Sequence, residues 1–87
     1  MVKTQMIWTM SRFQIENQDS LDEITMAVRA KTDEHMNNGK QIAPVERIED
    51  PANDQFTSIR TFVDRAAADE WVAFCEPYGP LSVTILE

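Results

Sequence analysis

Arginine and aromatic side chains are the residues of this chain whose types and spacing best suit the binding of a small molecule. Arg12 and Arg60 lie in two segments of alternating apolar and polar residues, and both share even-numbered positions with Trp8 and Phe62. Alternate residues of a strand point to one face of a sheet, and a guanidinium there can stack on aromatic rings and bind a carboxylate. We therefore take Trp8, Arg12, Arg60 and Phe62 as candidate ligand-binding residues for a small anionic or aromatic ligand. An ion pair between subunits is the simpler role for the two arginines.

Histidine and cysteine, which often carry out catalysis, each occur once. His35 falls near the apolar side of a helical segment, and no carboxylate or cysteine at a suitable spacing would make it a general base. Cys75 falls on an apolar helical stripe, where a free thiol is expected to be buried and unreactive. The sequence therefore predicts no catalytic residue.

Metal and cofactor sites have no pattern in this chain either. Acidic pairs such as Asp22-Glu23 and Asp33-Glu34 lack the regular oxygen spacing of a calcium loop. The two glycines, Gly39 and Gly79, fall at the ends of expected elements and form no phosphate-binding loop. We expect no metal and no cofactor.

The charge balance and the cysteine count narrow the expected partners and compartment. The chain has 8 basic and 15 acidic residues, a formal net charge of −7. Such a balance argues against nucleic acid and against anionic membranes, because both are bound by clustered Lys and Arg. One cysteine forms no disulfide within the chain, and neither a secretory signal nor an apolar run of about 18 residues is visible. We expect a cytoplasmic protein without nucleic-acid or membrane partners.

The helices and strands that position these side chains can be predicted from the spacing of the apolar residues, which changes along the chain. A two-residue period indicates strands, and a spacing of three to four residues indicates helices. The predicted strands cover residues 4–13, 42–48, 56–63 and 81–86, and the predicted helices cover 21–36 and 66–75. This βαββαβ order predicts one α+β domain over residues 1–87, a ferredoxin-like four-stranded antiparallel sheet with two helices on one face. Pro44 places the second strand at an edge.

The first and third strands carry apolar residues on both faces, so one apolar set must remain on the face without helices. We predict that the uncovered set forms a dimer interface, because exposed apolar patches usually mark contact surfaces. That set is Met6, Trp8, Met10, Phe56 and Phe62. The set predicted to meet the helices is Ile7, Phe13, Ile59, Val63, Leu81, Val83 and Ile85. The reverse assignment of the two faces is the alternative.

The order of elements resembles the dimeric α+β barrel superfamily, which includes antibiotic-biosynthesis monooxygenases and stress-responsive barrel proteins. The most specific stretch is Phe62 to Val72, with an aromatic strand end, the acidic cap Asp64, small residues and then Trp71. The resemblance implies two ferredoxin-like sheets paired face to face. It supports the fold and a homodimer, and it assigns no catalytic residue.

Two functions remain open from the sequence. The first is a homodimeric binding or structural module without catalysis. The second is a small cofactor-independent monooxygenase- or isomerase-like enzyme, with a pocket between the sheet and the helices. An RNA-recognition module shares the element order, but the third strand lacks the required glycine–aromatic pattern and the chain is acidic.

Overall fold

The computed structural model describes residues 1–13 and 18–87, with side chains described for residues 1–11 and 26–87. Its main elements are β1 (Val2–Thr9), α1 (Gln18–Asn37), β2 (Glu46–Asp50), β3 (Gln55–Phe62), α2 (Arg65–Cys75) and β4 (Ser82–Leu86). Three short 3-10 helices, η1 (Met10–Phe13), η2 (Pro51–Asn53) and η3 (Glu76–Tyr78), follow β1, β2 and α2. The βαββαβ order predicted from the sequence is confirmed.

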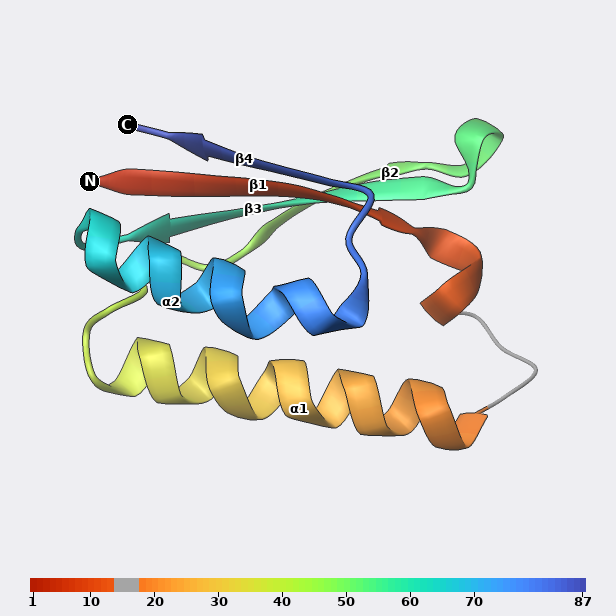
Figure 1. Ribbon diagram of the computed structural model, residues 1–87, viewed down its shortest axis with the longest axis horizontal. Helices are drawn as coiled ribbons and strands as arrows, with labels where there is room; N and C mark the ends of the chain where they lie inside the picture. The colour runs from red at the N-terminus through yellow and green to blue at the C-terminus, as the bar shows by residue number, and fades with distance from the viewer. Residues whose placement is uncertain (14–17) are drawn as a thin grey trace.

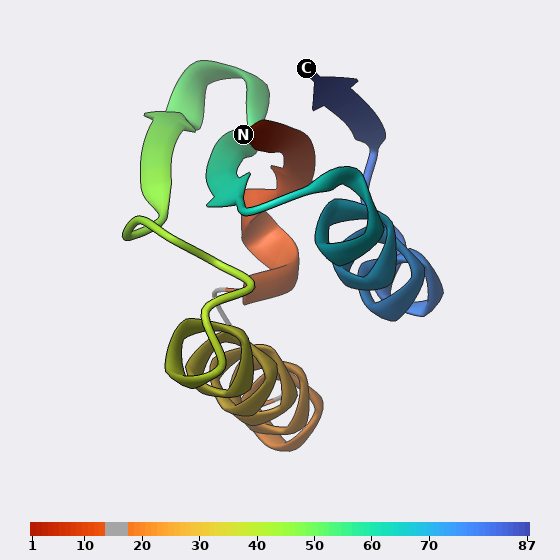
Figure 2. The same cartoon turned by 90° about the vertical axis from the view of Figure 1, so that its left-hand side faces the viewer.

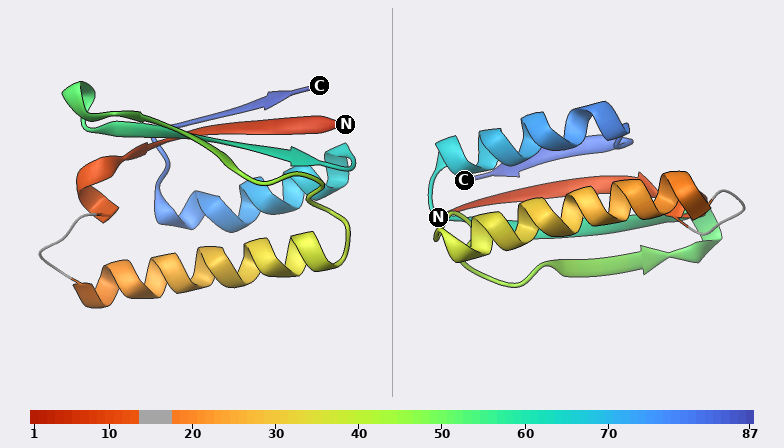
Figure 3. Two further views of the ribbon diagram at one scale, coloured as in Figure 1. Left: turned by 180° about the vertical axis from the view of Figure 1, so that it is seen from behind. Right: turned by 90° about the horizontal axis from the view of Figure 1, so that it is seen from below.

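The four strands form one antiparallel sheet in the order β2-β3-β1-β4. The first and third strands are therefore central and the second and fourth are edges, as predicted. Both helices lie on the same side of the sheet (Figure 1), and the view from below shows them side by side across it (Figure 3). The α+β class and the two-layer arrangement are thus those of a ferredoxin-like fold.

The first strand is shorter than predicted because a distant carboxylate turns the chain away. β1 ends at Thr9, and residues 10–13 form η1 instead of continuing the strand to residue 13. Asp54, which has a left-handed backbone at φ 54°, accepts hydrogen bonds from the Ser11 amide at 2.9 Å and the Ser11 hydroxyl at 2.6 Å. The Asp54 carbonyl accepts a third, from the Met10 amide at 2.8 Å. These contacts take the place of strand pairing for Met10 and Ser11.

The second strand also begins later than predicted, at Glu46 instead of residue 42. Gln41 makes an isolated bridge to Phe62, and the Ile42 amide donates to the carbonyl of Thr61 at 3.0 Å. Pro44 separates this short contact from β2, since proline offers no N–H to a ladder. The predicted edge position of the strand is nevertheless correct.

The helix ends follow from residues that the sequence makes recognisable. α1 ends at Asn37, and Gly39 then adopts φ +78°, a left-handed conformation that glycine reaches without strain. The Asp64 side chain caps α2 by accepting a hydrogen bond from the Ala67 amide at 2.8 Å. Both features agree with the sequence prediction.

The core lies between the sheet and α2, and it overturns the predicted assignment of the sheet faces. Met6, Trp8, Met10, Phe56 and Phe62 were predicted on the open face, but all five are buried in one cluster with the inner side of α2. Cross-strand partners lie on the same face, and Met6 pairs with Val83 and Thr4 with Ile85. Val83 and Ile85 therefore point toward the helices as predicted. The even-numbered residues of β1 lie on the same face of the sheet, because they pair with Val83 and Ile85.

The open face consists of the odd-numbered residues of the central strands. Ile7 and Ile59, which were predicted to meet the helices, lie there and are half-buried. Val63, from the same predicted set, is about half exposed just after β3. The Phe13 side chain lies outside the described part of the chain.

Candidate functional site

A pocket of about 320 Å³ opens between α1 and the helix-covered face of the sheet. Figure 2 looks along the strands and shows α1 facing the β2–β3 side of the sheet, while α2 covers the β1–β4 side. The lining residues come from α1, the three strands β1 to β3, the segment before β2, and α2. They are Trp8, Val28, Arg29, Thr32, Asp33, Val45, Arg47, Phe56, Ser58, Arg60 and Trp71. The lining thus combines residues far apart in the sequence.

The buried part of the lining is mainly aromatic. Trp8, Phe56 and Trp71 are each buried, and they line the pocket together with Arg60. At the mouth, the guanidinium carbon of the exposed Arg47 lies 4.0 Å from the ring centre of Phe56. Apolar walls with a few convergent polar groups are typical of small-molecule sites.

Arg60 is the unusual residue of the pocket, since it is a cation only 7% exposed. Its Nη1 donates hydrogen bonds to Thr32 Oγ1 at 2.9 Å and to Gln41 Oε1 at 3.2 Å, and its guanidinium carbon lies 4.1 Å from the ring centre of Trp71. The buried Nε has no hydrogen-bond partner, and no carboxylate of the described side chains forms an ion pair with Arg60. Burial lowers the pKa of Arg60 to about 10, so the group stays charged at neutral pH.

The charge around the pocket opposes the charge of the whole chain. Among the described lining residues, three of the five arginines of the sequence, Arg29, Arg47 and Arg60, stand against one acidic residue, Asp33. Arg47 also pairs with Glu49, whose Oε1 lies 3.3 Å from its Nε. The chain as a whole has a formal net charge of −7. A locally basic cleft in an acidic protein attracts anions to that place and not to the rest of the surface.

The structure brings together only part of the predicted ligand-binding set. Trp8 and Arg60 both line the pocket, on the helix-covered face instead of the open one. Phe62 is fully buried in the core, where its ring centre lies 5.9 Å from that of His35 and 6.3 Å from that of Trp71. The Arg12 side chain lies outside the described residues.

The part of the site that α1, β2 and α2 contribute was not predicted from the sequence. Trp71 was identified only as a core residue, and Arg29 and Arg47 were not singled out. Arg29 and Thr32 are spaced by three residues and lie on one side of a helix, which is the signal that was available. Nothing in the sequence shows that this side of α1 faces Arg60, because that depends on how α1 packs.

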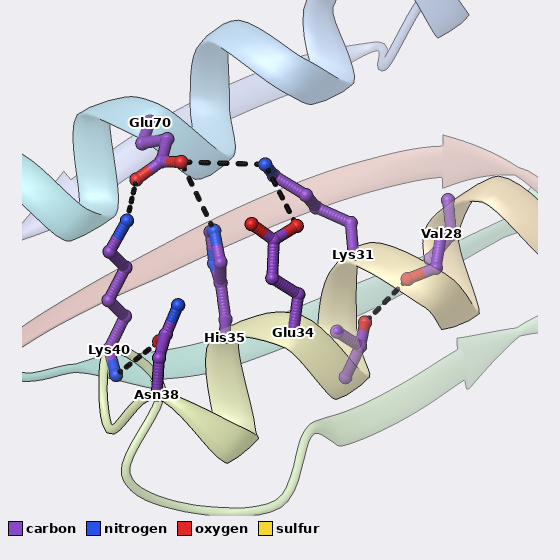
Figure 4. A network of polar contacts seen from close by, with 8 residues as sticks. Val28, Lys31, Glu34, His35, Asn38, Lys40 and Glu70 are labelled. Atoms are coloured by element: carbon purple, nitrogen blue, oxygen red, sulfur yellow. Dashed lines mark hydrogen bonds and ion pairs between the residues drawn. The ribbon is translucent and has the colours of Figure 1, made fainter.

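A second polar cluster lies between the C-terminal half of α1 and α2 (Figure 4). Glu70 of α2 lies 2.7 Å from Lys40 and 3.4 Å from Lys31, and its Oε1 lies 3.6 Å from Nε2 of His35. The hydrogen bond from Lys40 is the main reason that the pKa of Glu70 falls to about 2. His35 is fully buried and burial lowers its pKa, although nearby Glu70 acts in the opposite direction. The predicted structural role of His35 is consistent with this position.

Cys75 is fully buried at the end of α2, as its place on the apolar stripe predicted. Burial raises the pKa of its thiol to about 12, so the thiolate is scarce at neutral pH. Within the described residues, no group of three or more His, Cys, Asp and Glu side chains is placed to hold a metal ion. None of the described helices is both long and apolar enough to cross a membrane.

Comparison with known proteins adds no functional assignment. No protein-family model matches the chain, and no curated protein shows significant sequence similarity to it. Function must therefore be inferred from the pocket and from the chemistry of its lining.

Proposed function

We propose that the chain is a binding protein for a small acidic organic molecule, held in the pocket between α1 and the sheet. The observation that carries this proposal is Arg60, a buried cation in an aromatic-lined pocket without an ion-pair partner among the described side chains. A buried charge costs several kcal/mol unless an opposite charge or strong hydrogen bonds compensate it. An anionic ligand would supply the missing charge.

The proposal is tested by filling the pocket. Ser58 lines it and lies on β3 between Phe56 and Arg60, so Ser58→Phe should remove ligand-dependent stabilisation. Ala73→Phe is the matched control, because Ala73 is exposed on α2 and does not line the pocket. Thermal unfolding would be measured with a panel of small carboxylic acids at millimolar concentration. A wild-type protein that no acid stabilises, or equal responses of both variants, would contradict the proposal.

The alternative is a small cofactor-independent monooxygenase- or isomerase-like enzyme. The position of the pocket favours it, because the enzyme expected from the sequence has its pocket between the sheet and the helices. Asp33 is the one acidic residue of the described lining, and it is the group that proton transfer would use. Incubation of a bound acid with the protein under air, followed by mass spectrometry, distinguishes an enzyme from a binding module. Conversion that Asp33→Asn abolishes would establish the enzyme.

We also propose that two copies pair through the open face of the sheet, as in the dimeric α+β barrel superfamily. The central strands present Gln5, Ile7, Thr57 and Ile59 there, and the single charged residue that they add is Lys3. Glu46 and Asp50 of the edge strand β2 lie on the same face, opposite Ile59 and Gln55. The support for pairing is therefore the uncharged centre of the face, where Ile7 and Ile59 lie. Light scattering should then give about twice the monomer mass of 10.0 kDa. Ile59→Lys should shift the protein to the monomer, and a wild-type monomer at micromolar concentration would contradict the pairing.

A cytoplasmic location and the absence of a nucleic-acid partner remain predictions. The one cysteine is buried and free, which suits a reducing compartment. Three of the arginines gather at the pocket instead of forming the basic stripe that tracks a phosphate backbone. Absence of retention on heparin at low salt would agree with the second prediction.

A further inference from the structure

We infer that the ligand is a small aliphatic dicarboxylic acid, with one carboxylate at Arg60 inside the pocket and the other at Arg29 near its mouth. This inference rests on the proposed function and adds the number and the spacing of the acidic groups on the ligand. It depends on which atom of Arg60 faces the pocket, on which second arginine is unpaired, and on the distance between the two.

Arg60 presents one end of its guanidinium to the pocket. Its Nη1 already donates to Thr32 Oγ1 and Gln41 Oε1, and its Nε is enclosed by the protein. Arg60 lines the pocket, and Nη2 is the one guanidinium nitrogen that is neither hydrogen-bonded to a described residue nor fully enclosed. A carboxylate oxygen can therefore accept a charge-assisted hydrogen bond from Nη2.

The two neutral acceptors of Arg60 are themselves fixed. The Thr32 hydroxyl donates its proton to the carbonyl of Val28 at 2.7 Å, so its oxygen is free to accept from Arg60 Nη1. The Gln41 amide nitrogen donates to the carbonyl of Ala43 at 3.0 Å, which turns its oxygen toward the same Nη1. This support fixes the guanidinium before a ligand arrives, and a fixed group loses less entropy on binding.

Arg29 is the second arginine of the lining that can bind an acid. It is exposed on α1, lines the pocket, and forms no ion pair with a described side chain. Arg47 is already engaged, because its Nε lies 3.3 Å from Glu49 Oε1 and its guanidinium covers the ring of Phe56. Asp33 also lines the pocket, but it is not paired with Arg29 and leaves that guanidinium open to a ligand.

The distance between the two arginines limits the length of the ligand. Thr32, which contacts Arg60, lies three residues after Arg29, so both residues of α1 are on one side of the helix, a turn apart. One turn rises about 5.4 Å, and glutarate and adipate separate their two carboxylates by a similar distance. The pocket volume of about 320 Å³, near the lower end for small-molecule sites, suits ligands of this size.

The lining favours a carboxylate on a short aliphatic chain over a phosphate ester. Val28 and Val45 add aliphatic surface to a lining that is otherwise mainly aromatic, so methylene groups can be buried there. A phosphate group carries close to two charges at neutral pH. The single free nitrogen of Arg60 suits the one charge of a carboxylate better.

Paired probes test this inference. Glutarate and adipate would be compared by NMR titration with their monoamides, which keep the length of the chain and one carboxylate. We expect the wild-type protein to prefer each diacid about threefold at low salt, because ion pairs of an exposed arginine are weak and screened by salt. Arg29→Met should remove that preference and leave the binding of the monoamide unchanged. Arg60→Met should weaken the binding of diacid and monoamide alike, by about tenfold or more.

Controls separate the inference from the proposed function. Arg65→Met makes the same substitution on α2, where Arg65 pairs with Asp69 and Glu87, and it should leave the preference unchanged. Equal binding of diacids and monoamides, or a preference that survives Arg29→Met, overturns the inference while pocket binding stands. If neither diacids nor monoamides bind at millimolar concentration, the inference and the proposed function are both wrong. Circular dichroism of each variant would exclude unfolding as the cause of a lost signal.

Discussion

Two basic side chains contact Trp71, and their surroundings differ. The His35 ring centre lies 6.0 Å from that of Trp71, and His35 belongs to the cluster in which Glu70 is close to Lys31 and Lys40. The Arg60 guanidinium lies 4.1 Å from Trp71, beside an open pocket and without an acidic neighbour among the described side chains. One basic group therefore lies near a carboxylate, and the other has no carboxylate partner among the described side chains.

The difference suggests that the polar groups around His35 serve the stability of the fold, whereas those around Arg60 serve ligand binding. Around His35 the chain supplies charges of both signs, and the ion pairs of Glu70 with Lys31 and Lys40 join α1 to α2. Around Arg60 the described residues supply neutral hydrogen-bond partners and an aromatic wall, and none of their carboxylates compensates its charge. Sites that cost stability without an internal partner are frequently functional sites.

Removal of Trp71 should have the largest effect, because it supports both regions. Trp71 is almost fully buried, and Trp71→Ala should reduce the free energy of unfolding by about 3–5 kcal/mol, as for other core aromatics. Urea denaturation measures the loss. Val63→Ala, at a residue about half exposed, is the control and should cost less than about 1 kcal/mol. A loss below about 1 kcal/mol for Trp71→Ala would mean that α2 does not pack on the sheet as described.

His35→Leu tests whether the histidine is only a core residue. Neither ring nitrogen has a hydrogen-bond partner, so the variant should be about 1 kcal/mol more stable than the wild type at pH 8. Burial lowers the pKa of His35 below its ordinary 6.5, so the unfolded chain takes up a proton first as the pH falls. The wild type should therefore lose stability below about pH 6.5, and the variant should lose less. A strongly destabilised variant at pH 8 would show that the contact with Glu70 is a stabilising bond.

Arg60→Met should leave stability nearly unchanged, within about 1 kcal/mol, in contrast to Trp71→Ala. The substitution removes two hydrogen bonds, which stabilise the fold by about 1 kcal/mol each. It also removes a buried charge, whose desolvation destabilises the fold, so the two effects oppose each other. Thermal unfolding without ligand would measure the balance. A loss above about 3 kcal/mol would mean that Arg60 is a structural residue, and the contrast with His35 would then disappear.

Glu70→Gln should give the smallest loss at neutral pH, because Glu70 is 39% exposed and water screens its ion pairs. Its pKa of about 2, mainly due to Lys40, lies below the ordinary 4.5, so its stabilisation is complete above about pH 4.5 and is lost as the pH falls toward 2. Acid unfolding curves of wild type and variant should therefore converge in that range. Curves that stay parallel down to pH 2 would contradict the assigned interaction.

Much of the fold follows from the sequence by itself. The alternation of apolar residues predicts the strands, and their two-sided character places β1 and β3 at the centre of the sheet. Ala67, Ala68, Trp71 and Cys75 are buried as the helical spacing predicts, and Asp64 caps α2. These features depend on neighbours within a few residues, so local sequence determines them.

Only the tertiary structure decides which face of the sheet the helices cover and where the pocket forms. A strand with apolar residues on both sides could place either side against the helices. Met6 of β1 pairs with Val83 of β4, so these two residues, far apart in the sequence, lie on the same face of the sheet. The role of Arg60 depends in the same way on Thr32, 28 residues before it, and on the ring of Trp71. Such contacts form between elements distant in sequence, so their energies are set when the helices pack against the sheet and not by the residues on either side.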